Sequence, residues 1–228
     1  YYDSASHCMN IAGMVESLKS YPANTIVVLH ACCHNPTGVD LDEAQWKQVV
    51  ELVKERNLIP FLDMAYQGFA EGIEPDGAAV RLFAESGLPF FVSSSFSKSF
   101  SLYGERVGAL SIVTTGKEEA QRVMSQIKRV IRTNYSNPPT HGGTVVATVL
   151  NSPELRAMWE QELAEMRDRI KLMRHALVDK LAAKGVPGDF SFVKAQRGMF
   201  SYSGLTSAQV DRLRNEHGIY AVSTGRIC

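Results

Sequence analysis

The first half of the chain alternates apolar runs with stretches of helical pattern. The apolar runs cover 25–30, 58–62 and 90–94 and are rich in β-branched and aromatic residues, which is typical of strands buried on both faces. Between them, residues 40–53 and 78–86 carry apolar residues at helical spacing, and Asp40 with Glu43 resembles a capping box. Strands and helices that alternate in this way predict right-handed βαβ units and an α/β fold with a mostly parallel sheet.

The second half of the chain is mainly helical in pattern. Apolar positions at helical spacing predict helices over 118–132, 141–150 and 153–184. The last helix would be about 45 Å long, enough to bridge two domains. Beyond it, we expect short strands over 190–193, 198–202 and 219–222, and a helix that starts at the capping box Thr206 and Gln209. We therefore predict a larger domain over 1–150, followed over 151–228 by the bridging helix and part of a smaller α+β domain.

Polar side chains follow each of the three apolar runs. Asn35 follows the first run, Asp63 and Tyr66 follow the second, and Ser95 and Lys98 follow the third. Because the carboxyl ends of parallel strands lie at one edge of a sheet, these side chains should lie close together, where such sheets bind ligands. Each residue also has a local explanation as a turn residue, a cap, a packed aromatic or a solvated lysine.

The loop after the third run is rich in serine and contains Lys98, with Arg106 eight residues later. Hydroxyls, backbone N–H groups and a guanidinium together suit a phosphate. A lysine beside a bound phosphate, at the end of a buried strand, indicates a Schiff-base lysine. The alternative is a polar surface loop in which Arg106 pairs with its neighbour Glu105.

Composition narrows the class of protein. The formal net charge is zero and no apolar run approaches the roughly 20 residues of a membrane helix, so neither nucleic acid nor membrane is an expected partner. The four cysteines do not read as a disulfide framework, which favours a reducing, cytoplasmic setting. We expect no metal site at His30, Cys32, Cys33 and His34, because adjacent cysteines do not easily share one tetrahedral ion. The chain starts at Tyr1 and stops just after a strand-like run, so we expect a piece of a longer polypeptide.

Five segments carry a family likeness in their order along the chain: HNPTG at 34–38, DMAYQG at 63–68, SFSKSFSLYGERVG at 95–108, RTNYSNPP at 132–139 and STGR at 223–226. Together they resemble the class I, aspartate-type aminotransferases, which have fold type I and use pyridoxal 5′-phosphate. The likeness is strongest to the bacterial aromatic-amino-acid (tyrosine) and aspartate aminotransferases and covers essentially all of the chain. It implies a fragment that runs from the middle of the large domain into the small one.

The resemblance implies a cofactor role for each polar residue. Lys98 would bind pyridoxal 5′-phosphate covalently as an aldimine and then move the proton between the substrate Cα and the cofactor. Asp63 would face the pyridine nitrogen, and Tyr66 and Asn35 would donate to the 3′ oxygen; Lys98, Asp63 and Tyr66 are thus the implied catalytic residues. The phosphate would be held by Ser95, Ser97 and Arg106. Burial and the nearby Arg106 would both help Lys98 to lose its proton.

Substrate roles follow from the same resemblance. Arg226 would bind the α-carboxylate as a planar fork, with Asn35 nearby, and Arg132 would bind the distal carboxylate of an acidic substrate. In the family this second arginine comes from the other subunit, which implies a homodimer with shared active sites; Ser136 and Asn137 would line the same end. On local grounds Arg132 is simply a cation in the last turn of a helix.

The activity implied is a ping-pong exchange of an amino group between an aromatic or acidic L-amino acid and a 2-oxo acid, with 2-oxoglutarate and glutamate as one pair. Two alternatives stay open. One is a different reaction on the same fold, such as decarboxylation or elimination. The other is a pyridoxal-binding sensor domain of a transcription regulator, which would need a DNA-binding domain upstream.

Overall fold

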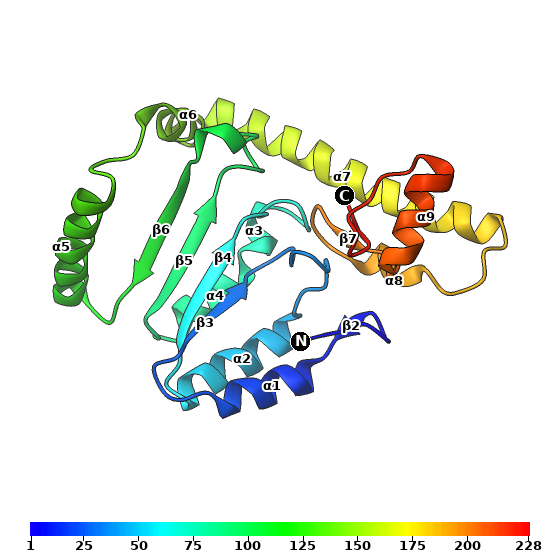
Figure 1. Ribbon diagram of the computed structural model, residues 1–228. Helices are drawn as coiled ribbons and strands as arrows, with labels where there is room; N and C mark the ends of the chain where they lie inside the picture. The colour runs from blue at the N-terminus through cyan, green and yellow to red at the C-terminus, as the bar shows by residue number, and fades with distance from the viewer.

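A four-stranded sheet in the order β3-β4-β5-β6 is the centre of the structure, a computed structural model that describes all residues 1–228 (Figure 1). β3 (Ile26–His30), β4 (Ile59–Met64) and β5 (Phe90–Ser95) run parallel, and β6 (Gly108–Val113) is antiparallel to β5. The β5–β6 connection contains the short 3₁₀ helix η1 (Tyr103–Glu105). The predicted α/β fold with a mostly parallel sheet is confirmed.

One face of the sheet is covered by helices that come from the βαβ connections. These are α1 (Ile11–Ser20), α2 (Glu43–Glu55) and α4 (Ala78–Glu85), with the single turn α3 (Ile73–Asp76) before α4. Their apolar faces pack on alternate strand residues to form a core of 17 buried residues. Its most deeply buried members are Val49, Val53, Leu62, Phe83 and Phe90. This packing holds the carboxyl ends of β3, β4 and β5 in a fixed array.

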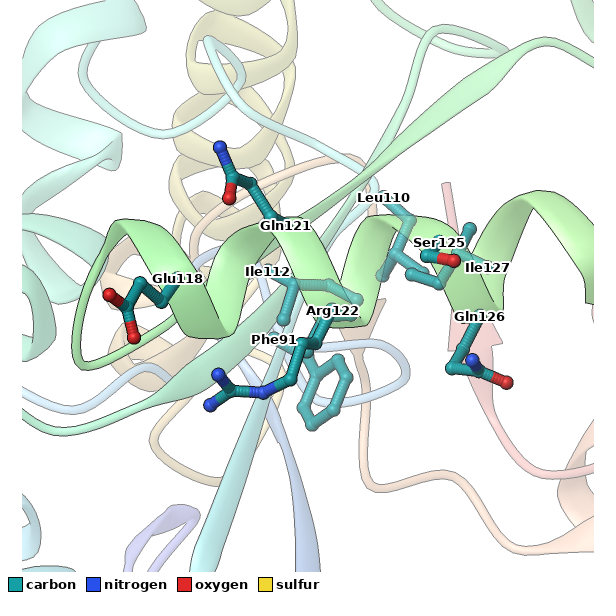
Figure 2. Close-up of a pocket in the computed structure, with 10 residues that line it drawn as sticks. Phe91, Leu110, Ile112, Glu118, Gln121, Arg122, Ser125, Gln126 and Ile127 are labelled. Atoms are coloured by element: carbon teal, nitrogen blue, oxygen red, sulfur yellow. The ribbon is translucent and has the colours of Figure 1, made fainter.

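The expectation that these strands are buried on both faces is wrong. Successive side chains point to opposite faces of a strand, so Ile26 and Val28 lie on the face away from α1, α2 and α4, where they are 60% and 62% exposed. On that face the amphipathic helix α5 (Lys117–Asn134), which has no buried residue, lies over β5 and β6. Figure 2 shows α5 in front of Phe91 and Ile112. The helix and the two strands line an open cavity of 1110 Å³.

The second half of the chain leads away from the sheet. After α6 (Thr140–Asn151), the 31-residue helix α7 (Pro153–Ala183) crosses to a small group of elements at the other side of the molecule (Figure 1). The hydroxyl of Ser152 caps α7 by accepting from Leu155 N. The small group contains α8 (Ser191–Ala195), β7 (Ser201–Tyr202), α9 (Ser207–His217) and β8 (Arg226–Ile227), and β7 pairs antiparallel with β8. The predicted domain boundary near residue 150 coincides with the turn between α6 and α7 and stays a prediction.

Two of the expected short strands are absent. Residues 190–193 belong largely to α8, because the Asp189 carboxylate accepts from Ser191 N at 2.8 Å and so starts a helical turn. Residues 219–222 form no strand; their apolar side chains are exposed and lie beside no strand partner. At the start of the chain, β1 (Tyr2–Asp3) and β2 (Cys8–Met9) form an antiparallel pair that precedes α1. None of the helices combines the length and the apolar character needed to cross a membrane.

Candidate active site

Three polar side chains lie in one row across the carboxyl edge of the sheet. The strand pairing places His30 beside Asp63 and Asp63 beside Ser93. Ser93 Oγ donates to Asp63 Oδ1 at 2.9 Å, and His30 Nε2 lies 3.9 Å from Asp63 Oδ2. The Asp63 carboxylate is therefore oriented from both sides by the neighbouring strands. Ser93 was not among the predicted site residues.

Asn35, Tyr66 and Arg226 form a second group beside this row. Arg226 Nη1 donates to Asn35 Oδ1 at 2.8 Å, across 191 residues of sequence, and Asn35 N donates to His30 Nδ1 at 3.1 Å. Tyr66 is buried, and Asn35 and Arg226 are both close enough to influence its phenol. Burial raises the pKa of the Tyr66 phenol, while Asn35 and the charge of Arg226 act in the opposite direction. The structure thus brings together residues that lie in three separate segments of the sequence.

The serine-rich loop lies against this group. The Lys98 Nζ is 4.8 Å from the centre of the Tyr66 ring, on its face. Within the loop, Ser97 is buried and its N–H donates to Ser95 Oγ at 3.2 Å. Arg106 has a left-handed backbone (φ 52°) and donates to Tyr103 O at 3.1 Å. The loop therefore combines an amine, hydroxyls and a guanidinium.

The expected alternative partner of Arg106 is occupied elsewhere. Glu105 pairs with His141 on α6 at 2.9 Å. None of the ion pairs of the structure includes Lys98, Arg106 or Arg226. Lys98 lies on the Tyr66 ring, Arg226 bonds to Asn35, and Arg106 belongs to the loop that carries Lys98. Cations without carboxylate partners give this edge of the sheet a positive potential. Such an edge is suited to anionic ligands.

Two carboxylates hold the loops that carry Asn35 and Tyr66. Asp40 accepts from the N–H groups of Cys33 at 2.7 Å and His34 at 2.8 Å, and burial raises the pKa of Asp40 against the effect of these bonds. Asp40 is thus not the cap of α2, as the sequence suggested. The cap is Asp42, which forms a complete capping box with Gln45, because Asp40 is already engaged by its own loop.

Asp76 plays the same part for the second loop. It is buried, and its carboxylate accepts from Gly68 N at 2.8 Å, Ala70 N at 3.0 Å and Glu71 N at 2.9 Å. These donors follow Tyr66 directly in sequence, so Asp76 fixes the turn that carries Tyr66. Helix α3 had not been expected, and with it this anchor was missed.

Arg132 lies apart from the other predicted site residues. It is exposed in the last turn of α5, where it hydrogen-bonds to the Ser136 hydroxyl, and Ser136 Oγ is 3.5 Å from Asn137 Oδ1. In Figure 1 α5 is at the opposite side of the sheet from the small group of elements that contains β8. No hydrogen bond or ion pair of the structure joins Arg132, Ser136 or Asn137 to Arg226.

The buried cysteines raise the question of a metal site again. The ligand atoms of Cys32, Cys33 and Asp76 lie within 4.8 Å of one another. A hydrogen bond from Cys32 and burial both raise the pKa of the Cys33 thiol, which keeps it protonated. The Asp76 oxygens already accept three backbone N–H groups. The chemistry of these side chains is therefore that of a packed loop.

A family model described as "Aminotransferase class I and II" matches residues 1–228. The chain belongs to this aminotransferase family. It is 72% identical to an aspartate aminotransferase of Pseudomonas aeruginosa and 52% identical to the aromatic-amino-acid aminotransferase of Escherichia coli, and each match covers 100% of the chain and 57% of the relative. It also matches the crystal structure of an aromatic-amino-acid aminotransferase from Burkholderia pseudomallei covalently bound to pyridoxal phosphate, with a TM-score of 0.99 and 73% identity over 100% of the chain and 57% of that protein.

These matches show the family and its fold type I architecture, and they agree with the predicted family. The chain spans 57% of the length of the relatives named above. Ser93, which donates to Asp63, had no signal in the sequence. Its position depends on strand register, which periodicity does not reveal.

Proposed function

We propose that the protein that contains this chain is a pyridoxal 5′-phosphate-dependent aminotransferase that acts on aromatic or acidic L-amino acids. One observation carries the proposal. Lys98 and Arg226 lie at one sheet edge beside a phenol, an amide and an oriented carboxylate, and neither has a carboxylate partner. Arg106, in the loop that carries Lys98, has no carboxylate partner either. This donor set matches an anionic cofactor and an anionic substrate together.

The residues fit the cofactor group by group. Arg106 with the hydroxyls of Ser95 and Ser97 suits the phosphate, because a guanidinium and hydroxyl groups are good phosphate donors. Asp63 would face the pyridine nitrogen, with its carboxylate held by Ser93. Asn35 and Tyr66 would donate to the 3′ oxygen. Lys98 would supply the amine that holds the cofactor covalently.

When bound, the cofactor supplies an electron sink for the charge left at the substrate Cα after its proton departs. The chain's own residues do the rest. Lys98 takes the proton from Cα and returns it one position along, so it needs to be neutral in that step. Asp63 keeps a proton on the ring nitrogen through its negative charge. Arg226, fixed by Asn35, binds the α-carboxylate and so orients the Cα–H bond.

The substrate class follows from charge and from the relatives. Arg226 selects an α-carboxylate, and the 2-oxo acid partner carries the same group. The relatives include both aspartate and aromatic-amino-acid aminotransferases, and one matching structure is an aromatic amino acid aminotransferase of Psychrobacter cocrystallised with aspartic acid. We propose that both acidic and aromatic amino acids are substrates, with 2-oxoglutarate and glutamate as the shared pair.

A half-reaction tests the proposal. The full-length protein loaded with cofactor is mixed separately with aspartate, glutamate, tyrosine and phenylalanine, and the cofactor absorbance is followed. We expect the absorbance to change with at least one amino acid and to return on addition of 2-oxoglutarate. No change with any of the four would refute an aminotransferase. Binding without a change, together with DNA binding, would favour the regulator alternative.

A second experiment identifies the covalent residue. Borohydride reduction and peptide mass analysis should place the cofactor on the peptide that contains Lys98. Lys98→Ala should abolish this attachment, whereas Lys117→Ala, at an exposed lysine, should leave it unchanged. A cofactor found on another lysine would show that Lys98 has been assigned wrongly.

A homodimer with shared sites is part of the proposal, because Arg132 lies apart from Arg226 within one chain and would have to serve a neighbouring subunit. Lys98→Ala and Arg132→Leu proteins should each be nearly inactive toward aspartate. If the two residues come from different subunits, mixing and reassociating the variants should restore about a quarter of native activity, since half of the dimers would then hold one intact site. No restoration would contradict shared sites.

The absence of disulfides among the four cysteines supports a reducing compartment, the cytoplasm.

A further inference from the structure

Arg174 is a buried arginine in the middle of α7, with 6% of its surface exposed. Its guanidinium donates to one hydroxyl and three backbone carbonyls. The acceptors are Ser201 Oγ at 2.8 Å, Gln196 O at 2.9 Å, Gly198 O at 2.5 Å and Phe200 O at 2.9 Å. No ion pair of the structure includes Arg174. A buried guanidinium is stable only when its donors are satisfied, and here the acceptors all belong to residues 196–201.

The 196–201 segment therefore has its shape set by one side chain. Its accepting carbonyls belong to alternate residues, Gln196, Gly198 and Phe200, and all three point toward α7. This leaves the segment's other side free to face the sheet. A planar fork with five N–H donors is the only ordinary side chain that can satisfy four acceptors spread over six residues.

The other side of the segment is pressed against the Asn35 loop. Arg197 N donates to Gly38 O at 2.7 Å. Gly198 has a φ of 82°, and a Cβ added to it would lie 2.4 Å from Cβ of Cys33. The segment can approach this loop so closely only because residue 198 is glycine. It is thus clamped between Arg174 on α7 and the loop that carries Asn35.

Phe200 connects the 196–201 segment to the site residues Tyr66 and Arg226. Its ring lies edge-on to Tyr66, with the ring centres 5.4 Å apart and an interplanar angle of 82°. The Arg226 guanidinium carbon lies over the same ring, 4.4 Å from its centre. A guanidinium that rests on an aromatic face keeps its edge open for a bidentate ligand. Phe200 is therefore the surface on which the α-carboxylate fork is supported.

We propose that Arg174 is a positioning residue for substrate binding: through the 196–201 segment it fixes Phe200, and Phe200 fixes the orientation of Arg226. This inference rests on the proposed role of Arg226 in binding the substrate α-carboxylate. Arg174 touches neither substrate nor cofactor. Its loss should therefore weaken carboxylate binding selectively, without a matching loss of cofactor binding.

The test uses the full-length, cofactor-loaded protein and succinate, a dicarboxylate that has no amino group to transfer. Arg174→Lys keeps the charge but has too few donors and no planar fork. We expect the Kd for succinate to rise about tenfold or more, as is usual when a binding group is displaced by about 1 Å, while cofactor affinity changes less than twofold. Arg169→Lys is the matched control, because Arg169 is an exposed arginine of the same helix with no hydrogen bond or ion pair. KM for the amino acid should rise more than kcat falls.

A double-mutant cycle tests the route through Phe200. Phe200→Leu alone should raise the Kd for succinate as Arg174→Lys does. The Kd of the double variant should be no higher than the higher of the two single-variant values. Additive losses, equal losses of cofactor and succinate affinity, or an unchanged succinate Kd in Phe200→Leu would each overturn the proposal. Phe200→Leu decides the matter even if the Arg174 variant does not fold. Failure of the native protein to bind succinate would instead refute the proposed function itself.

Discussion

Asp76 provides the sharpest test of how the site loops are held. Its buried carboxylate accepts three backbone N–H groups, from Gly68, Ala70 and Glu71, at 2.8, 3.0 and 2.9 Å. These groups form the turn that follows Tyr66. If the carboxylate shapes this turn, its removal should affect both the stability of the fold and the position of the Tyr66 ring.

The size of the effect follows from the number of bonds. A hydrogen bond to a charged group contributes about 1.5–3 kcal/mol, and a buried donor left without a partner costs about 1–3 kcal/mol. Asp76→Ala should therefore lower the free energy of unfolding by about 3–6 kcal/mol, allowing for partial relaxation and solvation of the turn. Asp76→Asn has almost the same shape. Because its amide nitrogen donates, at least one of the three N–H groups loses its acceptor, and the loss should be about 1–3 kcal/mol.

Urea unfolding of the full-length protein, followed by circular dichroism, measures these differences. Glu74→Gln is the matched control, since Glu74 lies on the same helix α3 and its side chain is 84% exposed. Its only ion pair is with the partly exposed Arg81, so the change should be within about 0.5 kcal/mol. Cofactor affinity, measured in native buffer, should fall in Asp76→Asn and stay unchanged in Glu74→Gln. If Asp76→Asn costs no more stability than Glu74→Gln, the three bonds do not hold the turn and the reasoning is refuted.

Three further changes test other parts of the structure. Gly198→Ala should lower the free energy of unfolding by about 2 kcal/mol or more, because the added Cβ clashes with Cys33 and the backbone has a strained positive φ. Gly87→Ala is the control for the backbone strain alone, since Gly87 has a φ of 73° and no atom lies within 4 Å of its added Cβ. Burial, followed by the charge of His30, lowers the pKa of His34 from 6.5 to about 4. As the pH falls from 6.5 to 4, the unfolded chain therefore takes up this proton before the folded protein does, and the free energy of unfolding decreases. His34→Gln should reduce the difference in the free energy of unfolding between pH 7 and pH 5, measured by urea unfolding. Ser93→Ala should weaken cofactor binding about three- to tenfold, because the Asp63 carboxylate loses the hydrogen bond that orients it. Ser94→Ala, on the opposite face of β5, should leave cofactor binding unchanged. Equal effects of the two substitutions would contradict a role for the Ser93 hydroxyl.

Much of the site was predictable because it depends on one topological fact. Once residues 25–30, 58–62 and 90–94 are recognised as parallel strands, their carboxyl ends must share an edge. Asn35, Tyr66 and Lys98 are brought together by that fact and by little else. The family resemblance then gave each of them a role, which the strand pattern could not supply.

The parts that were missed depend on pairings that a single sequence does not encode locally. Ser93 faces Asp63 only in one strand register, and a shift by one residue would place it on the other face. By spacing, Asp40 is a plausible helix cap. In the structure Asp42, two residues closer to α2, is the cap, and the Asp40 carboxylate instead accepts from backbone N–H groups of its own loop. The contact between Arg226 and Phe200 joins a loop to the chain's last strand. Short runs such as 190–193 fit a strand or a helical turn equally well, and one bond from Asp189 decides between them.

These missed residues share a physical property that explains why the site can keep its cations unpaired. Asp40, Asp76 and Arg174 are ionisable, and each is hydrogen-bonded mainly to backbone groups of a loop. The loops are therefore held in place without using the charge of any site residue. Had an anchor such as Asp76 instead paired with Lys98 or Arg106, the loop would be equally fixed, but the positive potential that attracts a phosphate or a carboxylate would be cancelled. Anchoring through the backbone separates the rigidity of the edge from its charge, and a site for anionic groups needs both.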